Sequence, residues 1–422
     1  MPYVLGMDIG STNTGAAVAR WRGETWARPE MIALDVRSTV VPSVLHLSPD
    51  GSLTVGEPVA ADPERTARDF VRRIGDDVPL LLGGEPCPPQ TLIAELAMWV
   101  VEQVSAREGG LAEAVVLSHP AAWGPHRREL LQRALWELGL GNVTLLPRTV
   151  TVAENHAARG FPGTTAAVYA LGGNTFEGAL VRRSPSGTYE TFGLPQGLEP
   201  LGGADFDEAL AEHVRAVLRR DFADTAPRET TLRGLLPECE RVKRELAVST
   251  EADVILALPA GPVRIPVTRA QFEDMVRPAV RATVDLLVRT VHSAGLTPAE
   301  LDGVLLAGGS ARIPLVTELL AAAFPVPVEM EPDPQLTAAT GAALAACQVV
   351  SPRSRRPAPV PASARVSGAE RAEGSAIPAR RHPEHAATVH GEPPPRPPVR
   401  ITPLNLPKPS RLALIPRRGR EG

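Results

Sequence analysis

The sequence predicts an α/β protein of two similar lobes followed by a Pro- and Arg-rich tail. A turn made of glycines and hydroxyl residues joins two apolar runs at residues 7–15, and the same design returns at residues 169–178. A third glycine pair, at residues 308–309, separates an apolar run from a helical stretch. Strands and helices alternate between these points, which is typical of α/β architectures. The expected boundaries are residues 1–165 for the first lobe, 166–350 for the second and 351–422 for the tail.

The first turn, Met7 to Gly15, lies between apolar runs at residues 3–6 and 16–19, and this pattern predicts a β-hairpin. Glycine allows backbone N–H groups to approach a ligand closely, and a concave run of such donors suits a phosphate. Asp8 ends the first strand, where a hydrated cation would sit beside that phosphate. The alternative is an ordinary hairpin in which Asp8 and Asn13 only form the turn.

The second turn, Gly172 to Thr175, repeats this design far along the chain. Two such hairpins predict that each lobe offers one turn to a single ligand between them. Gly308 and Gly309 end the apolar strand at residues 304–306 and open a helix. A glycine turn at a strand-to-helix junction, with helix N–H groups available, is another place for a nucleotide. The three turns in this order predict a nucleotide-binding protein.

Apolar periodicity predicts the elements between and after the turns. The first lobe is expected to contain short strands within residues 31–60, helices at 90–107, 125–138 and 152–158, and strands at 114–118 and 143–146. The second lobe is expected to contain helices at 208–218, 239–246, 269–293 and 338–347, and strands at 252–256 and 304–306.

The composition indicates a soluble protein of a reducing compartment. The chain of 422 residues is long enough for two or three domains. Cys87, Cys239 and Cys347 are widely scattered and form no metal-ligand spacing, so we expect free thiols. The N-terminus lacks the pattern of a signal peptide, and no apolar run reaches the roughly 18–20 residues of a membrane span. A cytoplasmic location and no membrane span are therefore expected.

The tail differs from the rest of the chain in charge and composition. It contains about 14 Lys and Arg against about 5 Asp and Glu, so that an acidic body carries a basic tail. About a fifth of its residues are proline and none is aromatic, which predicts disorder because too little apolar area offsets the ordering entropy. The polyproline-like segment 391–398 and the apolar segment 404–415 are candidates for docking a protein partner, with a plain disordered tail as the alternative. Nucleic acid is not an expected partner of the acidic body.

Several motifs in this order resemble the nucleotide-binding domain of the seventy-kilodalton heat-shock chaperone (DnaK-like) family. Asp8 to Asn13 is similar to the family's first phosphate hairpin, and Leu171 to Glu177 is similar to its second. Residues 201–207, 239–244 and 308–314 are similar to the family's next glycine segment, its adenosine helix and its adenosine loop.

The likeness covers about residues 3–348 and implies an actin-like ATPase fold of two duplicated RNase H-like lobes. It also implies ATP or ADP with Mg²⁺ as the ligand, and Asp8 at the metal. A guanidinium plane stacks well on a purine, which gives a physical reason for the two Arg residues that the resemblance places around adenine. The implied contacts are Gly10, Ser11, Thr12 and Asn13 from one lobe; Gly172, Gly173, Asn174 and Thr175 from the other; Gly202 and Gly203 along the nucleotide; Glu240 and Lys243 at the ribose; Arg244 and Arg312 at the adenine; and Gly308, Gly309 and Ser310 in the adenosine loop.

The positions near the phosphates depart from the family pattern. Ala170 stands where the family has Asp, and Arg148 stands where it has Glu. A family Lys that contacts the attacking water corresponds to Val71, with Arg72 next to it. Single groups of this kind are often worth about 10²–10³ in the rate of hydrolysis, so weak turnover is expected. The alternative keeps activity: Arg148 and Arg72 neutralise the phosphates directly, while Asp8 alone holds the hydrated Mg²⁺.

The predicted function is that of an ATP-binding, chaperone-like protein with weak or altered ATP hydrolysis, whose catalytic positions are Asp8, Arg72, Arg148 and Thr175. No run of alternating strands follows residue 350, so we expect the β-sandwich that grips peptides in this family to be absent. One alternative is a non-hydrolysing actin-fold scaffold, a pseudo-ATPase that uses nucleotide only for structure. Another is a small-molecule kinase of the same superfold, with Asp205 and Asp207 as the acidic groups to consider, but the motifs at 239–244 and 308–314 favour the chaperone branch.

Overall fold

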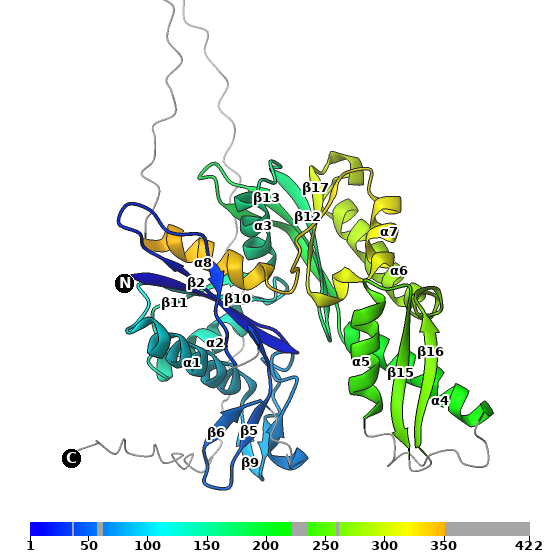
Figure 1. Ribbon diagram of the computed structural model, residues 1–422. Helices are drawn as coiled ribbons and strands as arrows, with labels where there is room; N and C mark the ends of the chain where they lie inside the picture. Colours follow the sequence, from blue (N-terminus) through cyan, green and yellow to red (C-terminus); the bar gives the residue numbers. More distant parts are fainter. Residues whose placement is uncertain (36–37, 57–61, 222–233, 259–260, 351–422) are drawn as a thin grey trace, which may run out of the picture. The chain divides into compact units, whose positions relative to one another are not determined.

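The computed structural model describes residues 1–350, except 36–37, 57–61, 222–233 and 259–260 (Figure 1). The chain divides into two units, Met1–Ala358 and Pro359–Gly422, and everything described below belongs to the first. The tail predicted at residues 351–422, with its two candidate docking segments, lies outside the described residues. None of the described helices is long and apolar enough to cross a membrane.

The first sheet is built around the hairpin predicted at residues 7–15. Strands β1 and β2 pair antiparallel, from Tyr3 opposite Arg20 to Ile9 opposite Thr14, and β10 and β11 follow β1 in parallel. The order among the described strands is β11-β10-β1-β2-β3, and β4 also pairs with β2. The bounds are β1 (Tyr3–Ile9), β2 (Asn13–Arg20), β3 (Glu30–Met31), β4 (Val40–Pro42), β10 (Val115–His119) and β11 (Val143–Pro147).

The second sheet repeats this plan. Strands β12 and β13 pair antiparallel, from Thr165 opposite Arg182 to Leu171 opposite Phe176, and β17 and β18 follow β12 in parallel. The order β14-β13-β12-β17-β18 has the same succession of antiparallel and parallel neighbours as the first sheet. This repetition confirms the predicted actin-like α/β fold. The bounds are β12 (Thr165–Leu171), β13 (Phe176–Arg183), β14 (Tyr189–Leu198), β17 (Gly303–Ala307) and β18 (Val328–Met330).

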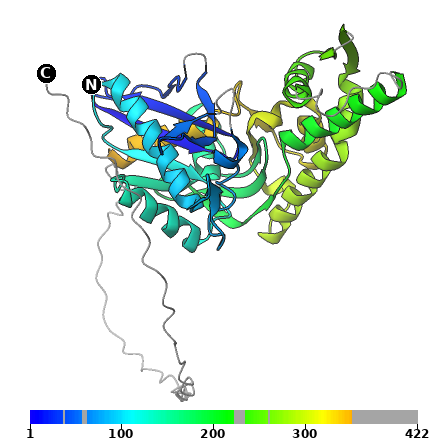
Figure 2. The ribbon, with the colours of Figure 1, turned by 90° about the horizontal axis from the view of Figure 1, so that it is seen from below.

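Helices cover both faces of each sheet, so β1 and β12 are buried on both sides. Helix α1 lies across the first sheet (Figure 2) and packs Leu96 and Val100 against the Met7 face of β1. Helix α8 covers the other face, where Ala342 packs with Val4 (Figure 1). On the second sheet, α4, α6 and α7 cover one face and α3 covers the other. The bounds are α1 (Pro89–Glu108), α2 (Pro125–Glu137), α3 (Arg148–Ala158), α4 (Gly203–Asp221), α6 (Arg269–Ser293), α7 (Pro314–Ala323) and α8 (Thr337–Val350).

Helices α3 and α8 contact each other and thereby join the two sheets. A Cβ added at Gly341 of α8 would clash with the backbone of Thr151 in α3, and one added at Gly6 of β1 would clash with the backbone of Ala343 in α8. Only glycine permits this approach of backbone to backbone. The sequence assigns α8 to the second lobe, whereas this helix packs on the first sheet. The division at residue 165 stays a prediction.

Smaller elements complete the described residues. Strands β15 and β16 form a hairpin that packs on α5 (Figure 1). Strands β5, β6 and β7 form a small sheet, and β8 pairs with β9. The bounds are β5 (Leu45–Leu47), β6 (Leu53–Val55), β7 (Thr66–Ala67), β8 (Leu80–Leu82), β9 (Glu85–Cys87), α5 (Leu235–Leu246), β15 (Glu251–Leu258) and β16 (Gly261–Thr268).

Candidate functional site

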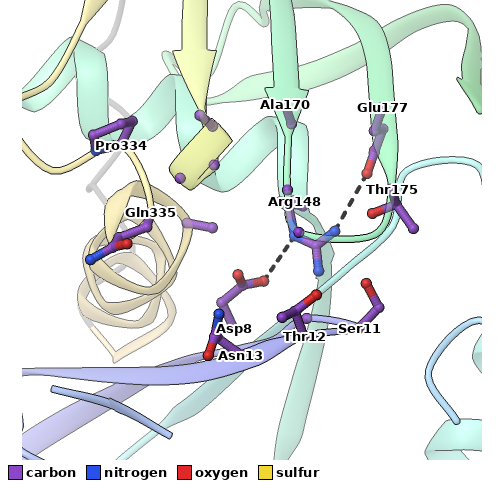
Figure 3. A pocket seen from close by; sticks show the side chains of 17 residues that line it. Asp8, Ser11, Thr12, Asn13, Arg148, Ala170, Thr175, Glu177, Pro334 and Gln335 are labelled. Carbon is purple, nitrogen blue, oxygen red and sulfur yellow. Dashed lines mark hydrogen bonds and ion pairs between the residues drawn. The ribbon is translucent and has the colours of Figure 1, made fainter. Parts of the chain in front are cut away.

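The turns predicted to bind phosphate meet at one pocket, here called the central pocket (Figure 3). It lies at the carboxyl ends of β1, β11, β12 and β17, which is where open α/β sheets usually bind ligands. The predicted site residues that line it are Asp8, Gly10, Ser11, Thr12, Asn13, Arg148, Gly172, Gly173, Thr175, Gly308 and Gly309.

The two hairpin turns have the same backbone geometry. The Gly10 N–H donates to Asn13 O at 3.0 Å, and the Gly172 N–H donates to Thr175 O at 2.9 Å. The turns also contact each other, because a Cβ on Gly173 would lie 2.5 Å from Thr12 Oγ1. The central pocket holds about 100 Å³, whereas typical ligand cavities start at about 300 Å³. A nucleotide therefore requires the contact between Thr12 and Gly173 to open.

The predicted glycine segments at 202–203 and 308–310 support the second turn from behind. The Gly203 N–H and the Ser310 hydroxyl both donate to Gly172 O, at 3.0 and 2.8 Å. Gly308 has a φ of +87°, and a side chain there would clash with the carbonyl of Leu171. Gly202, Gly203 and Ser310 therefore hold the turn and do not line the central pocket.

Arg148 lies at the centre of the site, between two carboxylates from different sheets (Figure 3). It is the first residue of α3, directly after β11. Its Nε donates to Asp8 Oδ1 at 2.9 Å, and its Nη1 lies 3.6 Å from Glu177 Oε2. The same Asp8 oxygen accepts a hydrogen bond from the Ser118 hydroxyl, and Glu177 accepts one from the Ala121 N–H at 2.6 Å.

Burial and the neighbouring charges shift the pKa values of Arg148 and Glu177 in opposite directions. Burial lowers the pKa of the Arg148 guanidinium, but Asp8 and Glu177 more than compensate, so its pKa is raised overall. Burial raises the pKa of the Glu177 carboxyl, although Arg148 acts in the opposite direction. The guanidinium is therefore a permanent positive charge in the centre of the site.

Four arginine nitrogens are buried without a hydrogen-bond partner among the described residues. Two of them, Arg148 Nη2 and Arg72 Nε, lie beside the hairpin turns, whereas Arg183 and Arg312 line neither the central pocket nor the pocket next to it. Arg72 Nε is 3.7 Å from Asp69 Oδ1, beyond hydrogen-bonding distance. Arg148 and Arg72 both line this second pocket, here called the side pocket, which shares Ser11 and Thr175 with the central pocket. Because buried donors almost always have partners, these two indicate an acceptor that the described residues do not supply.

The contacts of Asp8 do not fit a hydrated Mg²⁺. Magnesium in phosphate sites usually takes one or two carboxylates together with phosphate and water oxygens. Here Oδ1 of Asp8 already accepts from Arg148 and Ser118, and Glu177 faces the same guanidinium. A divalent cation beside Asp8 would lie next to a buried positive charge, and the two would repel each other strongly. The expectation that Asp8 holds magnesium therefore has no support in this arrangement.

The residues predicted to bind adenosine are held by acidic partners that the sequence did not reveal. Lys243 Nζ donates to Asp207 Oδ2 at 2.7 Å and to Gly203 O at 2.8 Å. Burial raises the pKa of the Asp207 carboxyl to about 6, against the opposing effect of Lys243. Arg244 pairs with Glu240 on the exposed face of α5. Arg312, in turn, pairs with Asp333.

The two acidic groups considered for a kinase have structural partners instead. Asp207 pairs with Lys243, and Asp205 Oδ2 accepts from the Gly202 N–H at 2.7 Å. Asn174 donates to Asp69 Oδ1 at 2.6 Å rather than lining the central pocket. Asp69 has a φ of +56°, a conformation that Asp tolerates better than most residues.

Sequence reasoning gave no role to Glu177 or Ser118. Each carries a signal that a closer look at the strands could have used. Glu177 is an acidic residue that follows the buried Phe176 in β13. Ser118 lies in β10 next to its last residue, and this strand runs parallel to β1 with the Cα of Ser118 opposite that of Asp8. A polar residue in such a place commonly faces a partner.

The chain is similar to a known protein family and to several curated proteins. The profile of the Hsp70 protein family matches residues 83–358. The chain is 27% identical over 358 residues to the chaperone protein DnaK of Elusimicrobium minutum, covering 82% of this chain and 58% of that protein. It is 27% identical over 361 residues to the DnaK of Thermotoga petrophila, covering 82% and 59%. It is 30% identical over 370 residues to the chaperone protein HscA homolog of Shewanella baltica, covering 81% and 58%. The chain thus spans less than two thirds of the length of these curated relatives.

Proposed function

The chain belongs to the Hsp70 protein family, and on that premise we propose that it binds an adenine nucleotide, ATP or ADP, at the central pocket. The observation that carries this proposal is the repeated glycine turn: the Gly10 and Gly172 turns have matching hydrogen bonds and line one pocket. Such turns present backbone donors to phosphate oxygens. The third turn, at Gly308 and Gly309, lines the same pocket from β17.

We propose that ATP hydrolysis at this site is weak. Ala170 brings no carboxylate to the end of β12, and Asp8 at the equivalent place in β1 is engaged by Arg148. Phosphoryl transfer depends on positioned cations and a positioned water, and both are sensitive to such changes. The ion pairs of Arg148 also favour a second candidate function, a pseudo-ATPase that binds nucleotide and does not turn it over.

We propose a chaperone-like role that rests on residues 1–350. The relatives named above are chaperones by name, and this chain spans 58–59% of their length. A peptide-binding module is not part of the proposal, because residues 351–422 lack the alternating apolar pattern of a β-sandwich. The basic, Pro-rich tail is proposed to recruit a protein partner. If the same proteins co-purify with the full chain and with a chain lacking 351–422, the tail has no such role.

Calorimetric titration of the full chain with ATP and with ADP tests the nucleotide site, and a phosphate-release assay on the same sample tests turnover. We expect saturable binding of both nucleotides and phosphate release well below about 1 s⁻¹, the lower limit of common turnover numbers. Absence of binding at millimolar nucleotide, with or without Mg²⁺, would remove the proposed function. Turnover above that limit would reject only the proposal of weak hydrolysis.

A further inference from the structure

The contacts of Arg148 place a positive charge where a phosphate site needs one. Its guanidinium lies between Asp8 and Glu177, and Figure 3 shows it directly above the turn that carries Ser11 and Thr12. Nε is used by Asp8 and Nη1 faces Glu177, whereas Nη2 is buried without an acceptor. The site therefore contains a cation whose remaining donor has no partner among the described residues.

A purely structural ion pair does not explain this arrangement. A buried guanidinium is stable when its N–H groups are all satisfied, and the two carboxylates leave one nitrogen without a partner. A second arginine lies beside the same turns: Arg72 Nε is also buried without a hydrogen-bond acceptor among the described residues, although its charge is paired with Asp69 Oδ1 at 3.7 Å. Both line the side pocket, together with the hydroxyl residues Ser11 and Thr175 and the carboxylates Glu177 and Glu199. Two such donors beside hydroxyl groups and glycine turns fit a ligand with phosphate oxygens, which the guanidinium fork binds as readily as it binds carboxylates.

We infer that Arg148 replaces a divalent cation at this site, so that the chain binds nucleoside di- and triphosphates in their metal-free form. The inference rests on the proposed nucleotide site and adds the form of the ligand. Arg148 Nη2 donates to a phosphate oxygen at the glycine turns, and Arg72 Nε donates to a phosphate in the side pocket. Asp8 and Glu177 orient the guanidinium and take no metal.

The first test uses the full chain without any substitution. The affinity for ADP is measured by calorimetry in EDTA and again in excess Mg²⁺. We expect the two dissociation constants to agree within about threefold, or the metal-free form to bind more tightly. If ADP binds about tenfold or more tightly with Mg²⁺, the inference is wrong and the nucleotide site stands. If ADP binds in neither buffer, the inference and the proposed function both fail.

The second test removes the arginine. Arg148→Gln should weaken metal-free ADP binding by about tenfold or more, because a hydrogen bond to a charged group is lost. Mg²⁺ should then restore part of the affinity, since the Asp8 carboxylate is no longer covered by a cation. Arg159→Gln is the matched control, because Arg159 follows the same helix, is 41% exposed and pairs with Glu331 away from the pocket. Metal-free binding by Arg148→Gln at the level of the unmodified chain would overturn the inference.

Arg148→Gln leaves two buried carboxylates without their cation, and such a change can prevent folding. Arg148→Lys keeps the charge and loses the forked geometry, so it provides a variant that folds. It should still bind ADP in EDTA, within about tenfold of the unmodified chain, and should gain little from Mg²⁺. A Lys variant that binds ADP only with Mg²⁺ would contradict the role of the charge.

Discussion

The β1–β2 hairpin and the β12–β13 hairpin have the same turn and different charged groups. In each turn a glycine N–H donates to the residue three positions later, and the residue two places before that glycine is Asp8 in one hairpin and Ala170 in the other. The position opposite on the second strand is Gly15 in one and Glu177 in the other. The carboxylate missing at Ala170 thus reappears across the strand pair. The backbone cradle is repeated, but the placement of charge is not.

This difference teaches how a duplicated fold changes its chemistry. Glycine and strand register fix the turns, and neither depends on the side chain at the strand end. A single exchange at that end alters the charge next to the ligand without disturbing the backbone. Arg148 lies between the two unequal hairpins and contacts the carboxylate of each.

The largest expected effect is on the rate of ATP hydrolysis, when the second hairpin is given the strand-end carboxylate of the first. Ala170→Asp gives β12 the carboxylate that β1 has and thereby a ligand for phosphate-bound Mg²⁺ that no arginine covers. We therefore expect phosphate release from ATP in excess Mg²⁺ to rise by about tenfold or more, since single groups in such sites are worth up to about 10³. The measurement is steady-state phosphate release by the full chain.

Ala170→Asn is the matched control for this change, because it has the same shape without the charge. Equal rates for the Asp and Asn variants would show that the absent carboxylate does not limit turnover.

A substitution at the contact between α3 and α8, which joins the two sheets, should have the next largest effect. Gly341→Ala places a methyl group against the backbone of Thr151, and overpacking of this kind should lower the free energy of unfolding by about 3 kcal/mol. Urea denaturation followed by circular dichroism measures it. Gly110→Ala makes the same substitution in open space and should change stability little. A loss at Gly341 no larger than at Gly110 would mean that α3 and α8 have room to separate.

Two buried histidines provide a matched pair, one near each sheet. Burial lowers the pKa of His119, at the end of β10, and of His156, in α3, to about 4 each. Because the folded protein holds these imidazoles neutral, their contribution to the free energy of unfolding is complete above about pH 6.5, the pKa in the unfolded chain. It is lost as the pH falls toward 4. Relative to His119→Gln or His156→Gln, the unmodified chain should lose about 1.4 kcal/mol of unfolding free energy per pH unit below pH 6.5.

Asp207 should show the opposite slope, because burial raises its pKa to about 6. The contribution of this carboxyl to the free energy of unfolding is fully present below its pKa in the unfolded chain, about 3.8. It is lost as the pH rises through 6. Relative to Asp207→Asn, the unmodified chain should therefore lose stability as pH rises from 4 to 6. Urea titrations at pH 4, 5, 6 and 7 measure both slopes, and parallel curves for all variants would contradict the assigned burial.

The smallest expected effect is a difference in stability between alanine substitutions in the two hairpin turns. A Cβ on Gly10 would lie 2.9 Å from Asn13 O, whereas one on Gly172 would lie 3.4 Å from Thr175 O. Gly10→Ala should therefore cost about 1 kcal/mol, and Gly172→Ala should be nearly neutral, because a tolerated alanine also restricts the unfolded chain. Thermal unfolding of the two variants measures the difference. An equal cost would mean that the turns are alike even at this level.

The sequence predicts the turns and the buried strands well because local rules govern them. Apolar runs with glycine between them predict β1, β2, β12 and β13. Strands β14 and β16 were not predicted, because Pro195 in one and Pro262 and Pro266 in the other lie within the run. Proline argues against a central strand, and both are edge strands, where proline is tolerated.

The charged part of the site was less accessible to sequence reasoning. Arg148 and Asp8 are 140 positions apart, and Lys243 and Asp207 are 36 apart. Such pairs depend on which strand and helix ends meet, and no local pattern encodes that. The motifs around Gly10, Gly172 and Gly308 predict where the pocket lies. The ion-pair partners of its arginines can be identified only in the folded structure.

The close contact between α3 and α8 at Gly341 affects how the two sheets can move relative to each other. No side chain separates the helices at Gly341, and the neighbouring residues of α8 are mostly alanine. A surface of small side chains has no long rotamers to rearrange, so a swivel about this point costs less than a swivel between interlocked large residues. Such a pivot would let the Thr12 and Gly173 tips part while the cores beneath them stay packed.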